Sequence, residues 1–475
     1  MAIEEYDILA IGSGSAVGGV DAWLRTHPQG RGALIDKDQP GGICLTRGCI
    51  PSKMLTSVAD VVRTIERAEE FGVSVKGSRV DFAKVMQRLH DHIDPEIRSI
   101  ENGLSHAPNL DYYHEQAEFV APYTLRSSGG VTMRSSRILL GLGSEPVLPP
   151  IVGLAASRPL TSDTVFGLTK RPEQLAILGG GYIAAEFAHF FAAMGTAVTV
   201  VGRNPRFLPQ EDPEISDIVT RSLGRRVRLI LGRQPDRVES GPRGRAVLHL
   251  PSTGHAPDEA LEVDRVLVAT GRGPTTAPLH PERAGIPTDS RGWIRVNEYL
   301  ETGQPGIWAL GDATGVYPFK HKANHDSKVL YRSLVQGRRT AVDYHAIPHA
   351  VFTDPEVASV GLTEPQALQR YATEGLLLGR YDYKDTAKGK AIGAEEGRAK
   401  VLVRSEGLEI VGVHIVGPHA SVLIQEVVNL LYTADRSARP ILDGMHIHPA
   451  LTEVVERAFL ALAPVAGPHH LAHAS

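Results

Sequence analysis

Two glycine-rich turns, each following a short apolar run and preceding a helical pattern, constrain this fold more than any other feature. The first turn follows residues 6–11 and reads GSGSAV at 12–17, with valine at the third glycine position of G-x-G-x-x-G. The second follows residues 174–178 and reads GGGYIA at 179–184. Such a strand–turn–helix unit lets the backbone approach a pyrophosphate at a helix N-terminus. The sequence therefore predicts two Rossmann-like dinucleotide-binding folds of the α/β class.

The side chain that ends the second strand differs between the two predicted folds. Asp36 ends the apolar run 33–35 in the first fold, where a carboxylate can accept both hydroxyls of an adenosine ribose. In the second fold Gly202 takes that place and is followed by Arg203 and Arg206. Because an arginine neutralises a ribose 2′-phosphate, the sequence favours NADPH over NADH as the second nucleotide.

Both cysteines of this 475-residue chain lie in one stretch, GGICLTRGCIPSK at residues 41–53. Positions five apart on an ideal helix are about 140° apart around its axis, so a Cys44–Cys49 bond needs a distorted turn, which Gly48 and Pro51 favour. The chain entropy of so short a loop stabilises a disulfide by only about 2 kcal/mol. Strained disulfides are the labile, catalytic ones, and the spacing therefore indicates a redox-active pair.

Polar residues elsewhere supply what thiol chemistry requires. Lys53 follows Cys49 by four positions, and a cation there favours a thiolate. Exchange of thiols and disulfides also needs a proton shuttle. His448, with Glu453 five positions later, provides a base and a carboxylate to orient it.

Composition excludes several functional classes. The net charge of −4 provides no basic field for nucleic acids or acidic membranes. No run of about 18 uninterrupted apolar residues occurs, so we expect no membrane span. The N-terminal MAIEEYD is acidic, unlike a signal peptide. We expect a cytoplasmic protein, and in that compartment a disulfide is more often catalytic than structural.

Two nucleotide sites and one cysteine pair together suggest an electron relay from NADPH through a flavin and a disulfide to a substrate. Two other interpretations remain open. Cys44 and Cys49 could form a metal site with His446 and His448, although the gap between the cysteines is wide and Lys53 disfavours a cation. Alternatively, the chain is a flavoprotein whose cysteines are incidental and whose electrons pass to quinones or oxygen.

The redox stretch matches the motif G-G-T-C-x-x-x-G-C-x-P-S-K of a known family, with Ile43 in place of threonine. Further matches are residues 179–186, the TGR at 270–272, the GD at 311–312 and the HP at 448–449 with Glu453. Residues 4 to about 462 thus resemble the class I pyridine nucleotide-disulfide oxidoreductases. The resemblance implies FAD and NADPH as cofactors, a small-molecule disulfide as substrate and a homodimer.

The resemblance also assigns roles to residues. Cys44 would attack the substrate disulfide and Cys49 would form the charge-transfer contact with FAD. His448 and Glu453 would reach the cysteines from the partner subunit. Lys53 and Glu186 would pair beside the flavin, Tyr182 would gate the nicotinamide pocket, Asp36 would hold the adenosine ribose, and Asp312 would hold the ribityl chain. The implied cofactor-binding residues are Gly12, Gly14, Asp36, Lys53, Ala117, Gly143, Ser144, Gly179, Gly181, Tyr182, Ile183, Glu186, Arg203, Gly271, Arg272, Asp312 and His321.

Within the family, the segments 160–164, 184–189, 320–325 and 350–355 resemble the mycothione reductase branch. The dihydrolipoamide dehydrogenase branch is the alternative, although its members normally carry an acidic residue where Gly202 stands because they use NAD. Two residues depart from the family pattern. Arg47 lies in the redox loop where a small apolar residue is usual, as a candidate contact for an anionic substrate. Leu142 replaces a threonine and is expected to alter FAD packing.

The expected domain organisation is discontinuous. Residues 1–150 and 276–345 form the FAD-binding domain, with a long helix over 320–344, and residues 151–275 form the NAD(P)-binding domain. Residues 346–464 form an α+β dimerisation domain. The tail, 465–475, is rich in Pro, Gly, His and Ala and is predicted to be disordered.

Overall fold

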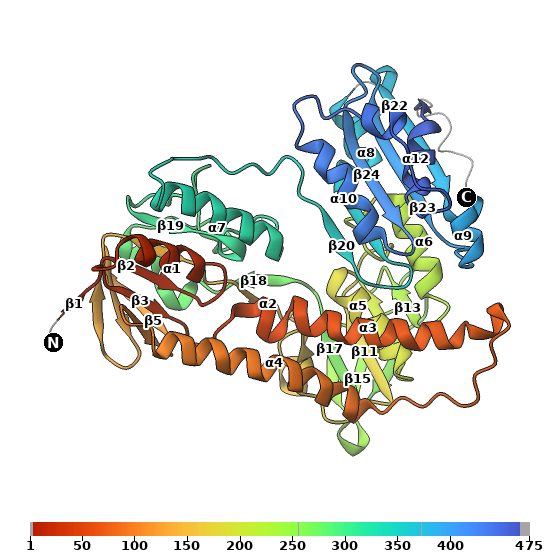
Figure 1. Ribbon diagram of the computed structural model, residues 1–475. Helices are drawn as coiled ribbons and strands as arrows, with labels where there is room; N and C mark the ends of the chain where they lie inside the picture. The colour runs from red at the N-terminus through yellow and green to blue at the C-terminus, as the bar shows by residue number, and fades with distance from the viewer. Residues whose placement is uncertain (1–2, 255, 372, 466–475) are drawn as a thin grey trace.

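The computed structural model describes residues 3–254, 256–371 and 373–465 and divides into three lobes (Figure 1). The first lobe is built on a parallel sheet of strand order β19-β8-β2-β3-β4, and a four-stranded sheet of order β1-β7-β6-β5 covers one of its faces. The strands of the parallel sheet are β2 (Ile8–Ile11), β3 (Gly32–Ile35), β4 (Leu110–Tyr113), β8 (Ile138–Leu140) and β19 (Ile307–Ala309). The covering strands are β1 (Ile3–Glu5), β5 (Ala117–Ala121), β6 (Thr124–Ser127) and β7 (Thr132–Arg134).

Alternate residues of β2 explain these two layers. Leu9 and Ile11 pack against the covering sheet, whereas Ile8 and Ala10 pack against α1 (Val17–Thr26) and α7 (Lys320–Leu334) on the other face. A strand that is buried on both faces reads as a continuous apolar run, which is the pattern found in the sequence.

The second lobe repeats this design with a parallel sheet of order β10-β17-β11-β12-β13. Its strands are β10 (Leu160–Thr161), β11 (Gln174–Leu178), β12 (Ala197–Gly202), β13 (Arg228–Leu231) and β17 (Arg265–Val268), and its helices are α5 (Tyr182–Ala193) and α6 (Pro213–Leu223). A three-stranded antiparallel sheet, β14 (Arg237–Ser240), β15 (Ala246–Leu250) and β16 (Glu259–Val263), covers the other face. An antiparallel ribbon of β9 (Ser144–Pro146) and β18 (Arg272–Pro274) joins the first two lobes.

The third lobe is an antiparallel sheet of order β20-β21-β24-β23-β22-β25. Its strands are β20 (His349–Val351), β21 (Val357–Gly361), β22 (Leu376–Asp382), β23 (Arg398–Arg404), β24 (Ile410–Val416) and β25 (Ala463–Pro464). Its helices are α8 (Glu364–Arg370), α9 (Ala387–Ala391), α10 (Ala420–Leu431), α11 (Arg439–Asp443) and α12 (Glu453–Leu460). Val465, the first residue of the predicted tail, is buried and donates its N–H to the Leu376 carbonyl, whereas the rest of that tail lies outside the described residues.

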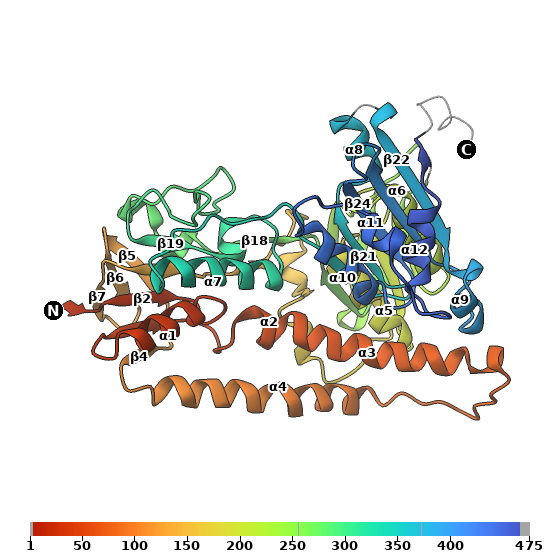
Figure 2. The ribbon, with the colours of Figure 1, turned by 45° about the horizontal axis from the view of Figure 1, so that its top comes forward.

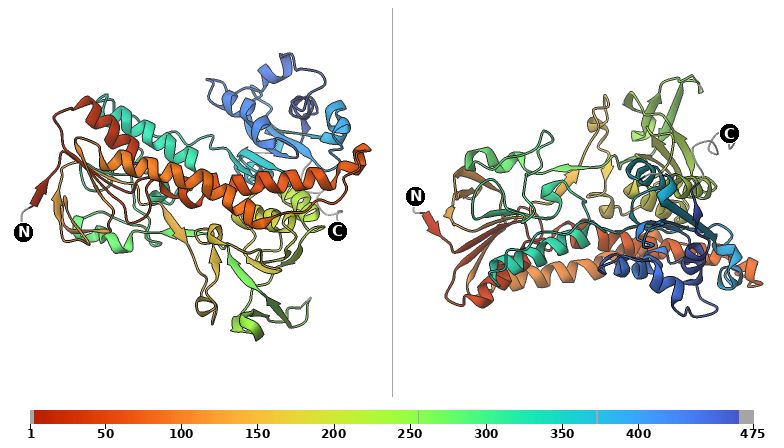
Figure 3. Two further views of the ribbon diagram at one scale, coloured as in Figure 1. Left: turned by 60° about the horizontal axis from the view of Figure 1, so that its bottom comes forward. Right: turned by 90° about the horizontal axis from the view of Figure 1, so that it is seen from above.

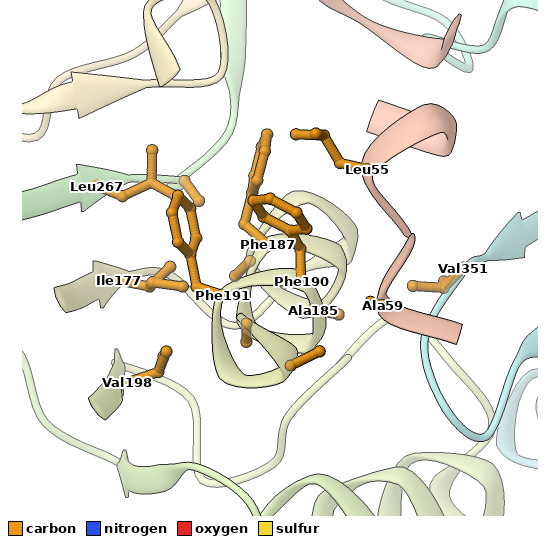
Figure 4. Close-up of a cluster of buried hydrophobic side chains, with 14 of the residues drawn as sticks. Leu55, Ala59, Ile177, Ala185, Phe187, Phe190, Phe191, Val198, Leu267 and Val351 are labelled. Atoms are coloured by element: carbon orange, nitrogen blue, oxygen red, sulfur yellow. The ribbon is translucent and has the colours of Figure 1, made fainter. Parts of the chain in front are cut away.

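Two long helices, α3 (Cys49–Glu66) and α4 (Phe82–Ser105), run side by side from the first lobe towards the junction of the other two (Figures 2 and 3). Leu55 and Ala59 of α3 join a buried cluster with Phe187 and Phe190 of α5 (Figure 4). The packing of α3 on α5 fixes the N-terminus of α3, and therefore Cys49, against the second lobe. None of the described helices is both long enough and apolar enough to cross a membrane.

The predicted α/β fold is confirmed, but one predicted helix is too long. We expected a helix over 320–344, whereas α7 ends at Leu334. Gly337 has a φ of 63°, which breaks a right-handed helix. The chain then turns back, and the Tyr344 hydroxyl donates to the Asp326 carboxylate at 2.5 Å.

Candidate active site

A single cavity of about 760 Å³ is lined by both glycine turns and by both cysteines. Most of the predicted site residues line it, namely Gly12, Gly14, Asp36, Cys44, Cys49, Lys53, Gly143, Gly179, Gly181, Tyr182, Ile183, Glu186, Arg203, Gly271, Arg272 and Asp312. Ala117, Ser144, His321, His448 and Glu453 do not. The structure thus gathers residues from far apart in the sequence around one space.

The two glycine turns share one backbone geometry. Gly12 has a φ of 97°, and a Cβ there would lie 2.2 Å from the Gly141 carbonyl oxygen. Gly179 has a φ of 126°, and its Cβ would lie 2.2 Å from the Ala269 carbonyl oxygen. Both positions therefore require glycine, because the turn passes directly over the end of a neighbouring strand. At Gly181 a Cβ would meet nothing within 4 Å, so this turn is open towards the cavity.

Asp36 is fixed at the end of β3 by the first glycine turn. Its Oδ2 accepts hydrogen bonds from the N–H and the hydroxyl of Ser13, both at 2.6 Å. The Ser13 hydroxyl oxygen in turn accepts the N–H of Gly41 at 3.1 Å. The first glycine turn, the acid and the start of the redox stretch therefore form one connected unit.

The two cysteines lie on either side of a break between two helices. Cys44 belongs to α2 (Gly42–Arg47), and Cys49 begins α3. Gly48 separates the two helices with φ −138° and ψ −117°, and a Cβ there would lie 2.7 Å from the Ile43 carbonyl oxygen. The distorted turn expected from the spacing is therefore present, and both cysteines are free thiols in the structure.

The electrostatics of the cysteine pair favour a single thiolate near neutral pH. A hydrogen bond with Cys49 is the largest cause that lowers the pKa of Cys44 to about 7; burial opposes it, and the charges of Lys320 and Lys53 add to the lowering. The same hydrogen bond, together with burial, raises the pKa of Cys49. The two thiols thus share one proton, and the first ionisation belongs to the pair.

Lys53 and Glu186 form an ion pair where α3 meets α5. The Lys53 Nζ lies 2.7 Å from both carboxylate oxygens of Glu186 and 4.5 Å from the ring centroid of Phe352. Glu186 also accepts the N–H of Phe352 at 3.2 Å. Side chains or backbone from all three lobes therefore meet at this pair.

Tyr182 stands at the start of α5 within a stack of rings. Its ring centroid lies 5.3 Å from that of His349 and 6.3 Å from that of Phe319. Burial and the nearby Glu211 raise the pKa of Tyr182. Glu211 accepts hydrogen bonds from His349 and from Ser359, both at 2.7 Å. Sequence reasoning missed Glu211 and His349, because their pairing links positions 138 apart in the chain.

Arg47, the candidate contact for an anionic substrate, is held by carboxylates of the same chain. Its guanidinium donates to Asp38 at 2.5 Å and to Asp163 at 3.1 Å. Asp163 also accepts from Arg272 at 2.9 Å. The charge of Arg47 is thus balanced inside the protein, and the side chain ties the redox turn to the segment that follows β10.

Arg272 continues this network to the far wall of the cavity. Its Nε donates to the Ser144 hydroxyl at 2.8 Å, and that hydroxyl donates to the Asp312 carboxylate at 2.6 Å. Ser144 therefore fixes Asp312 without lining the cavity. His321 also lies outside the lining, where its Nε2–H donates to the Pro348 carbonyl at 2.7 Å. Leu142, the second departure from the family pattern, does line the cavity.

Arg203 and Arg206 line the cavity beyond the second glycine turn. Arg206 pairs with Asp217 at 3.1 Å. Arg203 is exposed and forms no ion pair with any described residue. Of the two, Arg203 therefore has the freer charge for an anionic ligand.

His448 and Glu453 pair with each other but stand apart from the cysteines of the same chain. The His448 Nδ1 lies 2.9 Å from Glu453, whose other oxygen accepts the Ala450 N–H at 3.1 Å. The hydrogen bond from His448 is the largest cause that lowers the pKa of Glu453. The His448 side chain is 71% exposed. Among the described residues, no cluster of three or more His, Cys, Asp or Glu could hold a metal, so the rival site with His446 is not assembled within one chain.

Comparison with known proteins assigns this architecture. Residues 6–328 match the family model described as pyridine nucleotide-disulphide oxidoreductase, and residues 347–459 match the dimerisation domain of the same family. The chain belongs to the pyridine nucleotide-disulphide oxidoreductase family. Members of this family are flavoprotein disulfide oxidoreductases that use FAD and NAD(P)H, and the dimerisation domain supports a homodimer.

Individual relatives cover nearly the whole chain. Mycothione reductase of Mycobacterium tuberculosis is 35% identical over 470 residues, which are 97% of this chain and 100% of the relative. Dihydrolipoyl dehydrogenase of Synechocystis is 34% identical over 472 residues, which are 96% and 98% of the two chains. Among solved structures, the HOCl-induced flavoprotein disulfide reductase RclA of Escherichia coli matches with a TM-score of 0.84 and 28% identity, covering 96% and 99% of the two chains.

Proposed function

We propose that this protein is a cytoplasmic, homodimeric reductase that passes electrons from NADPH through FAD and the Cys44–Cys49 pair to a low-molecular-weight disulfide, in the manner of a mycothione reductase. The observation that carries the proposal is the single cavity that both glycine turns and both cysteines line. Because one cavity would hold all three groups, electrons can pass from the nucleotide to the flavin and on to the dithiol inside the protein.

The residues present fit the two cofactors of the family. The turns at Gly12 and Gly179 have the backbone geometry that a pyrophosphate requires, and Asp36 stands at the ribose position after β3. FAD, when bound, would supply two-electron transfer between the nicotinamide and the disulfide. Residues 1–150 with 276–345 would hold FAD, residues 151–275 the nicotinamide nucleotide, and residues 346–464 the dimer contact.

The protein's own groups then position and protect the reacting atoms. The ion pair of Lys53 and Glu186 places a fixed charge pair at the cavity wall beside the cysteines. Tyr182 stacks on His349 and Phe319, and its ring would cover the nicotinamide side of the flavin position. This ring would exclude water until the nucleotide displaces it.

On the wall of the cavity that Cys44 lines, its thiolate would attack one sulfur of the substrate disulfide. A mixed disulfide forms and the first thiolate leaves. The sulfur of Cys49, whose proton would pass to His448 of the partner subunit, then attacks the sulfur of Cys44. This step releases the second thiolate and restores the intramolecular disulfide. The imidazole of His448, oriented by Glu453 at 2.9 Å, would protonate the leaving thiolates from the second subunit.

The free charge of Arg203 supports NADPH as the donor. Residues 203–206, directly after β12, include no acid, and Arg203 lines the cavity without an ion pair among the described residues. An arginine at this position neutralises a 2′-phosphate.

A dihydrolipoyl dehydrogenase that uses NAD is the second candidate, because such an enzyme is 34% identical over almost the full chain. The same cysteine chemistry would then run towards NADH formation. Arg203 disfavours this candidate.

The deciding experiment is turnover of the purified holoenzyme with mycothiol disulfide, lipoamide and glutathione disulfide, using NADPH and NADH in parallel. The proposal expects the highest kcat/KM with mycothiol disulfide and NADPH. Preferred turnover of lipoamide with NADH would establish the second candidate. Cys44→Ser should abolish disulfide turnover while NADPH still reduces the flavin.

A further inference from the structure

Cations around the cysteine pair differ in whether the protein neutralises them. Lys53 is paired with Glu186 at 2.7 Å, and Arg47 is paired with Asp163 at 3.1 Å. Lys320 also lines the cavity, but within the described part of the chain no carboxylate lies within the 4.0 Å that defines an ion pair with it. The Nζ of Lys320 instead donates to the neutral hydroxyl of Ser15 at 2.9 Å.

The contact with Ser15 holds the ammonium of Lys320 beside the redox turn. Ser15 follows Gly14, and a Cβ added to Gly42 would lie only 2.6 Å from the Gly14 Cα. Gly42 begins α2, the short helix that carries Cys44. The first glycine turn and the redox turn are thus in direct contact, with Lys320 bonded to one and Cys44 carried by the other.

We infer that Lys320 stabilises the thiolate of Cys44 and so sets the pH above which this thiol is a nucleophile. Lys320 begins α7 in the first lobe, and its unbalanced charge acts on the sulfur, whereas the charge of Lys53 is largely offset by Glu186. The inference rests on the proposed role of Cys44 as the attacking thiol. It makes Lys320 a positioning charge rather than a catalytic residue.

The lowered pKa of Cys44 agrees with this geometry, and Lys320 contributes to it ahead of Lys53. The other groups that face Cys44 are Cys49 on α3 and the paired Lys53 and Glu186 on α3 and α5. The proposed dimer would add His448 with Glu453. Removing Lys320 therefore leaves no unpaired cation beside the sulfur among these groups, and the pKa of Cys44 must rise.

The sequence offered one signal for this residue. Lys320 opens the segment 320–325, which resembles the mycothione reductase branch, but a lysine at a helix start is usually a solvated surface charge. Only the contact with Ser15 and the shared cavity distinguish it from Lys328, which is exposed on the same helix.

The test measures the pH dependence of Cys44 alkylation in the reduced, FAD-loaded enzyme. Iodoacetamide is added at a series of pH values without oxygen, and mass spectrometry follows the modification of the Cys44 peptide. The wild-type midpoint should lie near pH 7. Lys320→Met should raise the midpoint by about one pH unit, and Lys320→Arg should restore it. Lys328→Met, on the exposed side of α7, should leave it unchanged.

An unchanged midpoint in Lys320→Met would overturn the inference. So would a variant that loses FAD while the alkylation midpoint of its remaining holoenzyme is unchanged, because Lys320 would then be a counter-ion of FAD. Alkylation needs no physiological substrate, so this result is independent of the proposed function. If the wild-type enzyme turned over no disulfide but Lys320→Met still shifted the alkylation midpoint, the inference about Lys320 would stand and the proposed function would fail.

Discussion

Arg47 lies between the two cysteines in the sequence, and its side chain ties their turn to residues distant in the chain. Its partners Asp38 and Asp163 are 35% and 21% exposed as side chains. Both carboxylates would lose a cation if the arginine were removed. In the proposed mechanism the two sulfurs bond and separate in each catalytic cycle, so a fixed turn affects the rate as well as the stability.

Arg47→Val should lower the free energy of unfolding by about 1–2 kcal/mol, because two partly buried carboxylates each lose one cation and keep only Lys37 or Arg272. It should also lower kcat more than it changes KM. Chemical denaturation and steady-state kinetics measure the two effects. Arg47→Lys, which keeps the charge, should recover part of the stability. If instead KM for the disulfide rose with kcat unchanged, Arg47 would be a substrate contact as the sequence first indicated.

Arg203→Glu should lower kcat/KM for NADPH by at least about tenfold, because a carboxylate repels the 2′-phosphate that an arginine attracts. The value for NADH should stay the same or rise. Steady-state kinetics with both nucleotides measures the ratio, and Arg206→Glu is a matched comparison because Arg206 already pairs with Asp217. An unchanged NADPH/NADH ratio in Arg203→Glu would show that Arg203 does not contact the 2′-phosphate.

At the scale of elements, α3 and α5 bring the cysteine pair and the second nucleotide fold together. Their packing is apolar around Leu55 and Phe187, and it is closed at the cavity by Lys53 and Glu186. Removing one partner of such an ion pair lowers the free energy of unfolding, because the remaining charge stays in a partly buried site.

Lys53→Met should therefore destabilise the protein and slow flavin reduction by NADPH by at least about tenfold, since Glu186 would remain as an uncompensated anion. Lys53→Met combined with Glu186→Leu should be less destabilised than the sum of the two single variants, with a coupling of about 1 kcal/mol or more. Thermal unfolding and stopped-flow reduction provide both measurements. Strict additivity would mean that the pair does not act as a unit.

Local sequence patterns predicted the helices and strands well. They could not predict contacts between residues that are distant in the chain. The runs before Gly12 and Gly179 indicated strands because both faces of those strands are buried, and the broken helix at Gly48 followed from helical geometry. The end of α7 at Leu334 was missed because the helical pattern continues past it. The contacts of Arg47 with Asp163 and of His349 with Glu211 join positions 116 and 138 apart, which a single sequence does not relate.

At the level of the dimer, the proposed site combines the cysteines of one subunit with His448 and Glu453 of the other. His448 and Glu453 are paired with each other outside the cavity. Large apolar side chains in the same segment, Met445 (103% exposed) and Ile447 (78% exposed), face solvent in the single chain. Val422 (67% exposed) lies on α10, whose Glu426 is 3.9 Å from His446. An apolar patch of this kind marks an interaction surface, and the dimerisation domain of the family supplies the partner, a second copy.

Mixed dimers test whether the site is shared. Cys44→Ser and His448→Ala homodimers should each be inactive with the disulfide substrate. A dimer of one of each contains one intact Cys44–His448 combination, so random exchange should restore about a quarter of the wild-type activity. Tagged subunits separated after exchange provide the measurement. Failure of isolated mixed dimers to regain activity would place both residues in the same subunit's site.

The relay from NADPH through FAD to Cys44 and Cys49 is tested most directly by adding one equivalent of NADPH to the oxidised holoenzyme without oxygen. Absorbance spectra and thiol alkylation are recorded together. We expect a long-wavelength charge-transfer band and the appearance of two alkylatable thiols, Cys44 and Cys49, with the flavin still largely oxidised. A fully bleached flavin with no new thiols would contradict it, because the electrons would then stop at the flavin.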